Sequence, residues 1–275
     1  MDVIGAHVRR LPPHDDRWVL RAHPSGELAR ALVVGKVAGT ATHPLDNVLG
    51  NIRMLLEGDP DKEFGLTGLQ DGFDEEAVLC LVEAGAGVRI DRAARSGPVE
   101  IRPEPMLEQL AAMGERLARA AERGETVALA TGHPDSMDYL LKPVGDLLEE
   151  RGGRVERLGT GVRWREDGRA HDWTVEHWGG VALQTDEHAP RHTHRPDAMQ
   201  RMLSEGLPDL VVADHGFAGA AIEAGVETLS FADVNDPALL VAKAQGRTEV
   251  VVVLDDHVPP ANYWPCFQAI AATIA

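Results

Sequence analysis

Apolar runs of strand length alternate with stretches of helical periodicity from about Pro105 to the C-terminus. The predicted strands lie at 126–130, 155–159, 209–214, 227–233 and 249–256, with one or two further extended segments within 173–185. The predicted helices lie at 106–123, 136–150, 196–205, 217–224 and 237–245. Strands that are apolar on both faces and joined by helices indicate right-handed crossovers in a mainly parallel sheet. We therefore predict an α/β fold, with a Rossmann-like sheet flanked by helices.

The chain before residue 105 has a different pattern, which favours helices over strands. Helices are predicted at 28–36, 45–57 and 74–83. The second carries Ile52 and Leu55 at helical spacing, and the third opens with an acidic turn that suits the helix dipole. Strand-like alternation is not convincing in this part. We expect residues 1–104 to form a mostly helical region that packs on or caps an α/β domain formed by residues 105–275.

Composition limits the classes of protein to which this chain can belong. With 44% hydrophobic and 26% charged residues over 275 positions, it has the values of a soluble globular protein. Lys and Arg number 27 against 44 Asp and Glu, and the net charge of −17 repels a nucleic-acid backbone. No apolar run is long enough to span a membrane, and no secretion signal is recognisable. We expect a cytoplasmic protein without nucleic-acid or membrane partners, and a homodimer as the default state.

Two cysteines and two aromatic residues are expected to serve packing. Cys80 and Cys266 are too few for a disulfide framework, so both are predicted to be buried thiols. Tyr263 and Trp264 are predicted to be core aromatics, and a place in the wall of a pocket is the alternative.

Polar side chains follow nearly every predicted strand. Because ligands bind beyond the carboxyl ends of parallel strands, we expect these side chains to line one cleft. Helix capping and tight turns are the structural alternative for each of them, and capping is the favoured interpretation of Asp236. The strand-end segments are 131–136, 214–216, 233–236 and 255–257. We also expect the segment 40–47 to contribute a polar group to this cleft, because His43-Pro44 repeats the His-Pro step of His133-Pro134.

The segment after the first strand of the sheet has the features of an anion site. It consists of a strand, a glycine turn and a helix whose first N–H groups are free. We expect Thr131, Gly132, His133 and Ser136 to bind phosphate there. The segment matches neither GxGxxG nor GxxxxGK[ST], and a tight turn with Ser136 as helix cap is the alternative.

A histidine-rich loop and a stretch of small residues add further candidates. His192 and His194 point to the same side of an extended segment, as metal ligands or phosphate donors would, with solvated loop histidines as the alternative. Gly216 lies in the run DHGFAGAAIEAG, where small residues allow the backbone to approach a ligand closely. That run lacks the GxGxxG spacing, so NAD is disfavoured.

Acidic residues at the strand ends predict a divalent metal site. Asp255 and Asp256 are adjacent at the end of the most apolar strand, so they face opposite sides and one faces the cleft. We expect the metal ligands to be Asp214, Asp233, Asn235 and Asp255. Because these ligands are hard oxygen donors and no cysteine accompanies them, the expected ion is Mg²⁺ or Mn²⁺.

Three stretches of the chain resemble a known family. They are ATGHPDSM, ADHGFAGAAIEAGVETLSFADVNDPALLVAKAQGR and VVVVLDDHVPPANYWP, and together they cover most of Thr126 to Pro265. They resemble a family of actinobacterial proteins labelled broadly as phosphatases. The resemblance implies hydrolysis of a phosphate ester on an α/β scaffold. The chain lacks the DxDx[TV], Cx5R and RHG motifs of other phosphatase classes, so the mechanism stays open.

These observations lead to two functional hypotheses. The first is a phosphatase that hydrolyses a small phosphate ester with the help of a divalent metal. Its expected catalytic residues are His133, Asp214, His215 and His257, and its substrate-binding residues are Thr131, Gly132, Ser136, His192, His194 and Gly216. The second is a non-catalytic module that binds a phosphorylated or nucleotide metabolite. Carboxylates repel phosphate unless a metal intervenes, which favours the enzyme.

Overall fold

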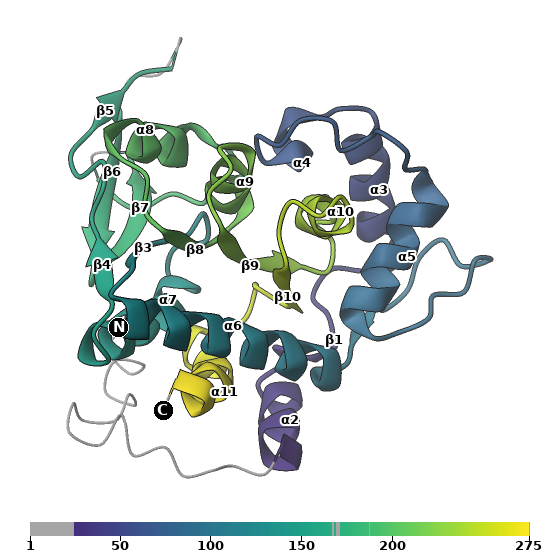
Figure 1. Ribbon diagram of the computed structural model, residues 1–275. Coiled ribbons are helices and arrows are strands. Elements are labelled where there is room, and N and C mark those ends of the chain that lie inside the picture. Colours follow the sequence, from purple (N-terminus) through teal and green to yellow (C-terminus); the bar gives the residue numbers. More distant parts are fainter. Residues whose placement is uncertain (1–24, 167, 169–170, 187, 275) are drawn as a thin grey trace.

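The computed structural model describes residues 25–166, 168, 171–186 and 188–274 (Figure 1). The strands are β1 (Gly39–Thr40), β2 (Glu100–Ile101), β3 (Thr126–Ala130), β4 (Arg154–Glu156), β5 (Arg163–Trp164), β6 (Trp173–Trp178), β7 (Val181–Thr185), β8 (Leu210–Asp214), β9 (Thr228–Asp233) and β10 (Val250–Leu254). The helices are α2 (Ser25–Val34), α3 (Leu45–Leu56), α4 (Pro60–Glu63), α5 (Glu75–Ala86), α6 (Pro103–Arg123), α7 (Asp138–Glu150), α8 (Asp197–Glu205), α9 (His215–Glu223), α10 (Ala238–Ala244) and α11 (Trp264–Ile274), and the 3₁₀-helix η1 spans Pro260–Tyr263.

An 8-stranded sheet forms the centre of the molecule. Its main order is β10-β9-β8-β3-β7-β6-β5, and the remaining strand, β4, pairs with β3 off this path. The pairs β10-β9, β9-β8, β8-β3 and β3-β7 are parallel, while β5, β6 and β7 are joined by antiparallel pairing. Strands β4 and β7 pair with the same edge of β3. The first residues of β3 pair with β4, and its last residues pair with β7. The predicted α/β fold with a mainly parallel sheet is confirmed.

The order of the strands fixes where a ligand can bind. The chain leaves β3 for β4 on one side of it and later returns to β8 on the other side. The direction of winding therefore reverses between β3 and β8. In doubly wound sheets the loops diverge at this point, and a crevice opens beyond the carboxyl ends of the strands.

Helices cover both faces of the sheet. Figure 1 shows α6, α7 and α11 on one face and α8, α9 and α10 on the other. The longest helix, α6, buries Met106, Leu110 and Leu117 at helical spacing, and Gly124 ends it in a left-handed conformation. Gly114 allows α6 to approach α11, because a side chain there would meet Thr273 and the backbone of Ile270. Among the described helices, none is both long and apolar enough to cross a membrane.

The part of the chain before residue 105 is described from Ser25, and residues 1–24 lie outside the described part. Helices α2, α3 and α5 overlap the three predicted segments, while the four-residue helix α4 was not predicted. A two-residue ladder joins β1 and β2 and is too short to show alternation in the sequence. Helix α5 packs against α10, α6 and β10, and one hydrophobic cluster includes residues from both sides of residue 105. The division into two domains at this residue stays a prediction.

The packing residues differ in one case from the expectation. Cys266 is buried in α11, but Cys80 is exposed, so its prediction as a buried thiol was wrong. Cys80 lies on the outer face of α5, where its sulfur is 3.5 Å from Arg92 Nη2. Tyr263 is fully buried, and Trp264 is half-buried against the core.

Candidate functional site

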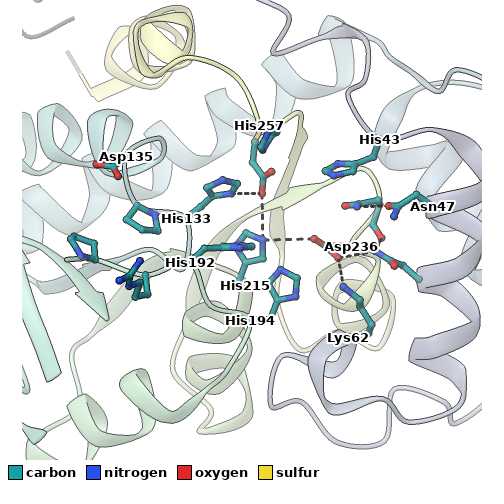
Figure 2. Close-up of a pocket in the computed structure, with 16 residues that line it drawn as sticks. His43, Asn47, Lys62, His133, Asp135, His192, His194, His215, Asp236 and His257 are labelled. Atoms are coloured by element: carbon teal, nitrogen blue, oxygen red, sulfur yellow. Dashed lines mark hydrogen bonds and ion pairs between the residues drawn. The ribbon is translucent and has the colours of Figure 1, made fainter. Parts of the chain in front are cut away.

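A cleft of about 570 Å³ opens at the carboxyl ends of the parallel strands. Residues after β3, β7, β8, β9 and β10 line it, and so do residues from the N-terminal segment (Figure 2). Each of the four strand-end segments expected to meet in one cleft contributes at least one lining residue. The lining residues are His43, Asn47, Asn51, Lys62, His133, Pro134, Asp135, Pro190, Arg191, His192, His194, His215, Asn235, Asp236, Asp256 and His257.

His215 lies at the centre of the cleft and is almost completely buried. It begins α9 with a φ of 44°, a left-handed backbone conformation that non-glycine residues adopt rarely. Its Nε2 atom lies 3.4 Å from Asp256 Oδ2 and 3.7 Å from Asp236 Oδ2, and its Nδ1 atom lies 3.4 Å from Asp214 Oδ1. Burial alone would lower the pKa of His215, but the charge of these carboxylates, Asp214 first, raises it well above its usual value.

Asp256 connects two of the histidines. Its Oδ2 atom lies 3.2 Å from His133 Nδ1 as well as 3.4 Å from His215 Nε2. Burial would raise the pKa of the Asp256 carboxyl, but the bond with His133 and the charge of His215 hold it well below its usual range. Asp256 is therefore a charged carboxylate at ion-pair distance from both imidazoles.

The loop after β7 brings two more histidines to the same place. The ring of His194 is stacked on that of His215, with centroids 4.8 Å apart, and the ring of His192 lies 4.7 Å from that of His133. Desolvation lowers the pKa of both loop histidines, to about 4 for His192, and the charge of His215 adds to this effect. Both are therefore neutral near pH 7, the form in which imidazole binds metals.

The loop is held in position by backbone contacts. Thr193 N donates a hydrogen bond of 2.9 Å to Gly132 O, in the turn after β3. Gly216 allows close packing from the other side, because a side chain there would overlap the backbone carbonyls of His194 and Arg195. These contacts fix the two imidazoles relative to the ends of β3 and β8.

The second wall of the cleft comes from the N-terminal segment. His43 Nδ1 lies 3.1 Å from Asp233 Oδ2, so the expected contribution of the segment 40–47 is confirmed. Asn47 and Asn51, one helical turn apart on α3, also face the cleft, and Lys62 Nζ lies 3.9 Å from Asp236 Oδ1. These residues enclose the strand ends from the side opposite His133 (Figure 2).

Two overlapping groups of side chains have the spacing of a metal site. One is formed by His133, His192 and His215, and the other by His194, His215 and Asp236. In each group the possible ligand atoms lie within 4.8 Å of one another, and His215 belongs to both. Imidazole suits zinc, iron and other transition metals, whereas magnesium prefers oxygen ligands. The donor atoms therefore fit a transition-metal ion better than Mg²⁺.

Comparison with known proteins agrees with the motifs in the sequence. A family model described as "Phosphatase" matches residues 23–274. The chain belongs to the Phosphatase family. It is 35% identical over 255 residues to a Streptomyces coelicolor protein named "Phosphatase SCO2771", and the match covers 90% of this chain and 95% of that protein. No solved structure matches the chain. Membership of this family supports phosphoric ester hydrolysis as the enzyme class. The resemblance seen in the sequence covered most of Thr126 to Pro265, and the family match also includes the N-terminal segment.

In this phosphatase the carboxylates expected to bind metal do not line the cleft directly. Asp214 accepts hydrogen bonds of 2.6 Å from Thr131 Oγ1 and from Gly132 N. Asp255 accepts from Thr42 N at 2.6 Å and from His257 N at 3.0 Å, so Asp256 is the member of the adjacent pair that faces the cleft.

Asp233 and Asn235 follow β9 and are both buried. Burial and the charge of Asp256 raise the pKa of Asp233 well above its usual value, although its bond with His43 acts in the opposite direction. Asn235 lines the cleft, and its Nδ2 atom donates to Asn47 Oδ1 at 2.6 Å. Neither residue belongs to the two candidate metal groups found in the described part of the chain.

The anion site expected after β3 differs in the structure from its prediction. Ser136 is buried behind the cleft, where its hydroxyl donates to Asp256 O at 3.0 Å. Helix α7 begins at Asp138, and Ser136 N donates to the Asp138 carboxylate at 3.0 Å. An acidic side chain therefore occupies the place where an anion was expected, and burial raises the pKa of Asp138 to about 6. Thr131 is also buried, and its hydroxyl accepts a hydrogen bond from His133 N.

Some lining residues were not expected from the sequence. Asp236 was interpreted as a helix cap, but Pro237 is the N-cap of α10 and no side chain caps it. Asp236 instead accepts a hydrogen bond from Asn51 Nδ2 at 3.3 Å. A signal for Asn51 exists in the sequence, since it is a polar residue on the buried face of a helix that is otherwise apolar there. Lys62 and Arg191 carry no comparable signal.

Proposed function

We propose that this phosphatase hydrolyses a small phosphate monoester in the cleft with the help of a divalent transition-metal ion. The observation that carries the proposal is the convergence of four imidazoles, those of His133, His192, His194 and His215, at the ends of three parallel strands. A capping or packing role explains a single buried histidine, but not a cluster in which ring centroids lie 4.7–5.8 Å apart.

Under this proposal His215 releases its proton when the ion binds and becomes a metal ligand, together with either His133 and His192 or His194 and Asp236. A divalent ion at this position would supply charge neutralisation at the phosphoryl oxygens and a more acidic water molecule. Asp256 and Asp214 act through the histidines that they orient, because carboxylates bonded to ligating imidazoles fix the ring and raise its basicity.

The remaining groups of the cleft would bind and protonate the substrate. His257 is exposed at the rim, with its ring centroid 6.2 Å from that of His133, and we assign it the proton that the leaving alkoxide requires. Lys62 and Arg191 line the cleft and are the cations available for the non-bridging oxygens of the phosphate. The expected cytoplasmic location and homodimer stay predictions.

The experiment is an activity assay of metal-depleted protein. We expect no hydrolysis of p-nitrophenyl phosphate without metal, and recovery on addition of Zn²⁺, Mn²⁺ or Fe²⁺ in preference to Mg²⁺. Full activity in the presence of a strong chelator would contradict the metal-assisted reaction. Calorimetry with inorganic phosphate tests the alternative, because binding of phosphate without turnover under any metal would identify a non-catalytic module.

A further inference from the structure

Three asparagine residues are joined by hydrogen bonds in the wall of the cleft that faces the histidines. Asn47 and Asn51 come from α3, and Asn235 comes from the turn after β9. Asn51 Nδ2 donates to Asn235 O at 2.9 Å, and Asn235 Nδ2 donates to Asn47 Oδ1 at 2.6 Å. Figure 2 shows Asn47 on one side of the cleft and His133 and His192 on the other. None of the three amides belongs to the candidate metal groups, although Asn51 also donates to Asp236, which belongs to one of them.

The bond between Asn235 and Asn47 determines which atoms of the two amides are left for a ligand. Because Asn47 Oδ1 accepts this bond, its remaining polar atom is the donor Nδ2. Because Asn235 uses its Nδ2, its remaining polar atom is the acceptor Oδ1. This oxygen is buried and has no hydrogen-bond partner among the described residues. Leaving a buried acceptor unpaired costs free energy, so the site favours a ligand that supplies a donor.

A hydroxyl group matches this arrangement. A hydroxyl donates one hydrogen bond and accepts others, so a single hydroxyl can donate to Asn235 Oδ1 and accept from Asn47 Nδ2. A carboxylate or phosphate can only accept, and an ammonium can only donate. The amide wall, formed by Asn47, Asn51 and Asn235, therefore discriminates between these groups by its hydrogen-bond pattern.

The rest of the lining has few aliphatic side chains. The lining residues include no Leu, Ile, Val, Met, Phe, Tyr or Trp, and Pro134 and Pro190 are the aliphatic side chains among them. The free energy gained from apolar burial scales with the area removed from water. A leaving group with an alkyl chain would find no pocket of aliphatic side chains among the lining residues.

The charges in the cleft oppose a second phosphate. Asp135, Asp236 and Asp256 all line it. Lys62 and Arg191 are the Lys and Arg side chains of the lining, and each also contacts an aspartate, Lys62 with Asp61 at 3.1 Å and Arg191 with Asp186 at 2.6 Å. A leaving group with a further phosphate would add negative charge beside these carboxylates, and the lining has no Lys or Arg beyond the two that the first phosphate would use.

We propose that the substrate is the monophosphate ester of a small, uncharged, polyhydroxylated alcohol, such as a sugar or polyol phosphate. This inference rests on the proposed phosphatase function and adds the class of the leaving group. Asn47 and Asn235 are the residues that select it, through one of its hydroxyl groups.

The test compares glycerol 1-phosphate with propyl phosphate, which has the same carbon chain and no free hydroxyl. We expect kcat/KM of the wild-type metal-loaded enzyme to be about 10-fold or more higher for glycerol 1-phosphate, since a site built to bond a hydroxyl rejects the analogue that lacks it. Asn47→Ala removes the donor without a change of charge, and Asn47→Asp keeps the acceptor for Asn235 but not the donor. Both variants are expected to reduce this ratio about 10-fold, with folding checked by circular dichroism.

The outcomes separate the two proposals. If wild-type protein hydrolyses p-nitrophenyl phosphate but has equal kcat/KM for propyl phosphate and glycerol 1-phosphate, the leaving-group proposal is overturned and the phosphatase function stands. An unchanged ratio in folded Asn47→Ala and Asn47→Asp proteins overturns the role of the amide wall. Absence of hydrolysis of every ester with every metal overturns both proposals.

Discussion

Asp256 Oδ2 lies 3.2 Å from His133 Nδ1, which joins the ends of β10 and β3 across the cleft. We predict that Asp256→Asn lowers kcat by about 100-fold, because the amide keeps the size of the side chain but not the charge that orients His133 and His215. The measurement is steady-state hydrolysis of p-nitrophenyl phosphate. Glu57→Gln removes one negative charge from an exposed position at the end of α3 and is the matched control. Equal losses in the two variants would show that overall charge, not orientation, is responsible.

His215 belongs to both candidate metal groups, and this makes it the most informative ligand to remove. We predict that His215→Ala weakens the binding of Zn²⁺ by about 100-fold or more in calorimetry, because the ion loses a direct ligand. His192 and Asp236 each belong to only one group. Whichever of His192→Ala and Asp236→Asn loses more Zn²⁺ affinity therefore identifies the group that holds the ion. His177→Asn is the control, since His177 lies in β6 outside the cleft. Wild-type affinity in His215→Ala would exclude both groups.

The packing of the histidine loop depends on Gly216. We predict that Gly216→Ala lowers activity by more than about 10-fold, because the added methyl group displaces the carbonyls of His194 and Arg195 and shifts both loop imidazoles. Gly50→Ala is the control, since a side chain at Gly50 meets nothing within 4 Å and alanine stabilises a helix interior by about 0.5–1 kcal/mol. Activity and thermal unfolding of both variants give the comparison. Retained activity in Gly216→Ala would mean that the loop tolerates the shift.

Asp138 gives a prediction about the pH dependence of stability. Burial raises the pKa of its carboxyl from 3.8 to about 6, so the folded protein binds this proton more tightly than the unfolded chain does. Its contribution is therefore present below the unfolded pKa and is lost as the pH rises through about 6. An amide in place of this carboxyl would keep the acceptor for Ser136 N without the charge. We predict that Asp138→Asn raises the free energy of unfolding at pH 8 by about 1–3 kcal/mol, and by much less at about pH 4.

Chemical denaturation of wild type and Asp138→Asn at the two pH values measures this difference. A gain of equal size under acidic and alkaline conditions would assign the effect to packing instead of ionisation. A loss under alkaline conditions would mean that the charged carboxylate stabilises the first turn of α7 despite its burial.

The fold follows from local patterns that are strong in this chain. The segment 126–130 is β3 as predicted, and the extended residues within 173–185 form the pair β6 and β7. The strand-end rule alone also predicts that His133, His215 and His257 share one cleft, as they do. These inferences use only the period of apolar residues and the direction of the strands.

The details of the site depend on contacts between distant segments, which a single sequence does not contain. The sequence does not distinguish which of Asp255 and Asp256 faces the cleft. In the structure Thr42 N donates a hydrogen bond to the Asp255 carboxylate, which leaves Asp256 to face the cleft. Asp236 has the sequence context of a helix cap, but in the structure it accepts a hydrogen bond from Asn51 of α3 and lines the cleft. In both cases the partner comes from the N-terminal segment, whose packing was expected only in outline.

The two walls of the cleft come from separate parts of the chain. The imidazoles of the candidate metal groups follow strands of the sheet, while Asn47 and Asn51 lie on α3. Under the proposed function, a substitution of Asn47 would therefore alter which alcohol is accepted without removing a group that acts on phosphorus. In evolutionary terms this architecture separates selectivity from reactivity, so duplicated copies can diverge in substrate without rebuilding the hydrolytic machinery.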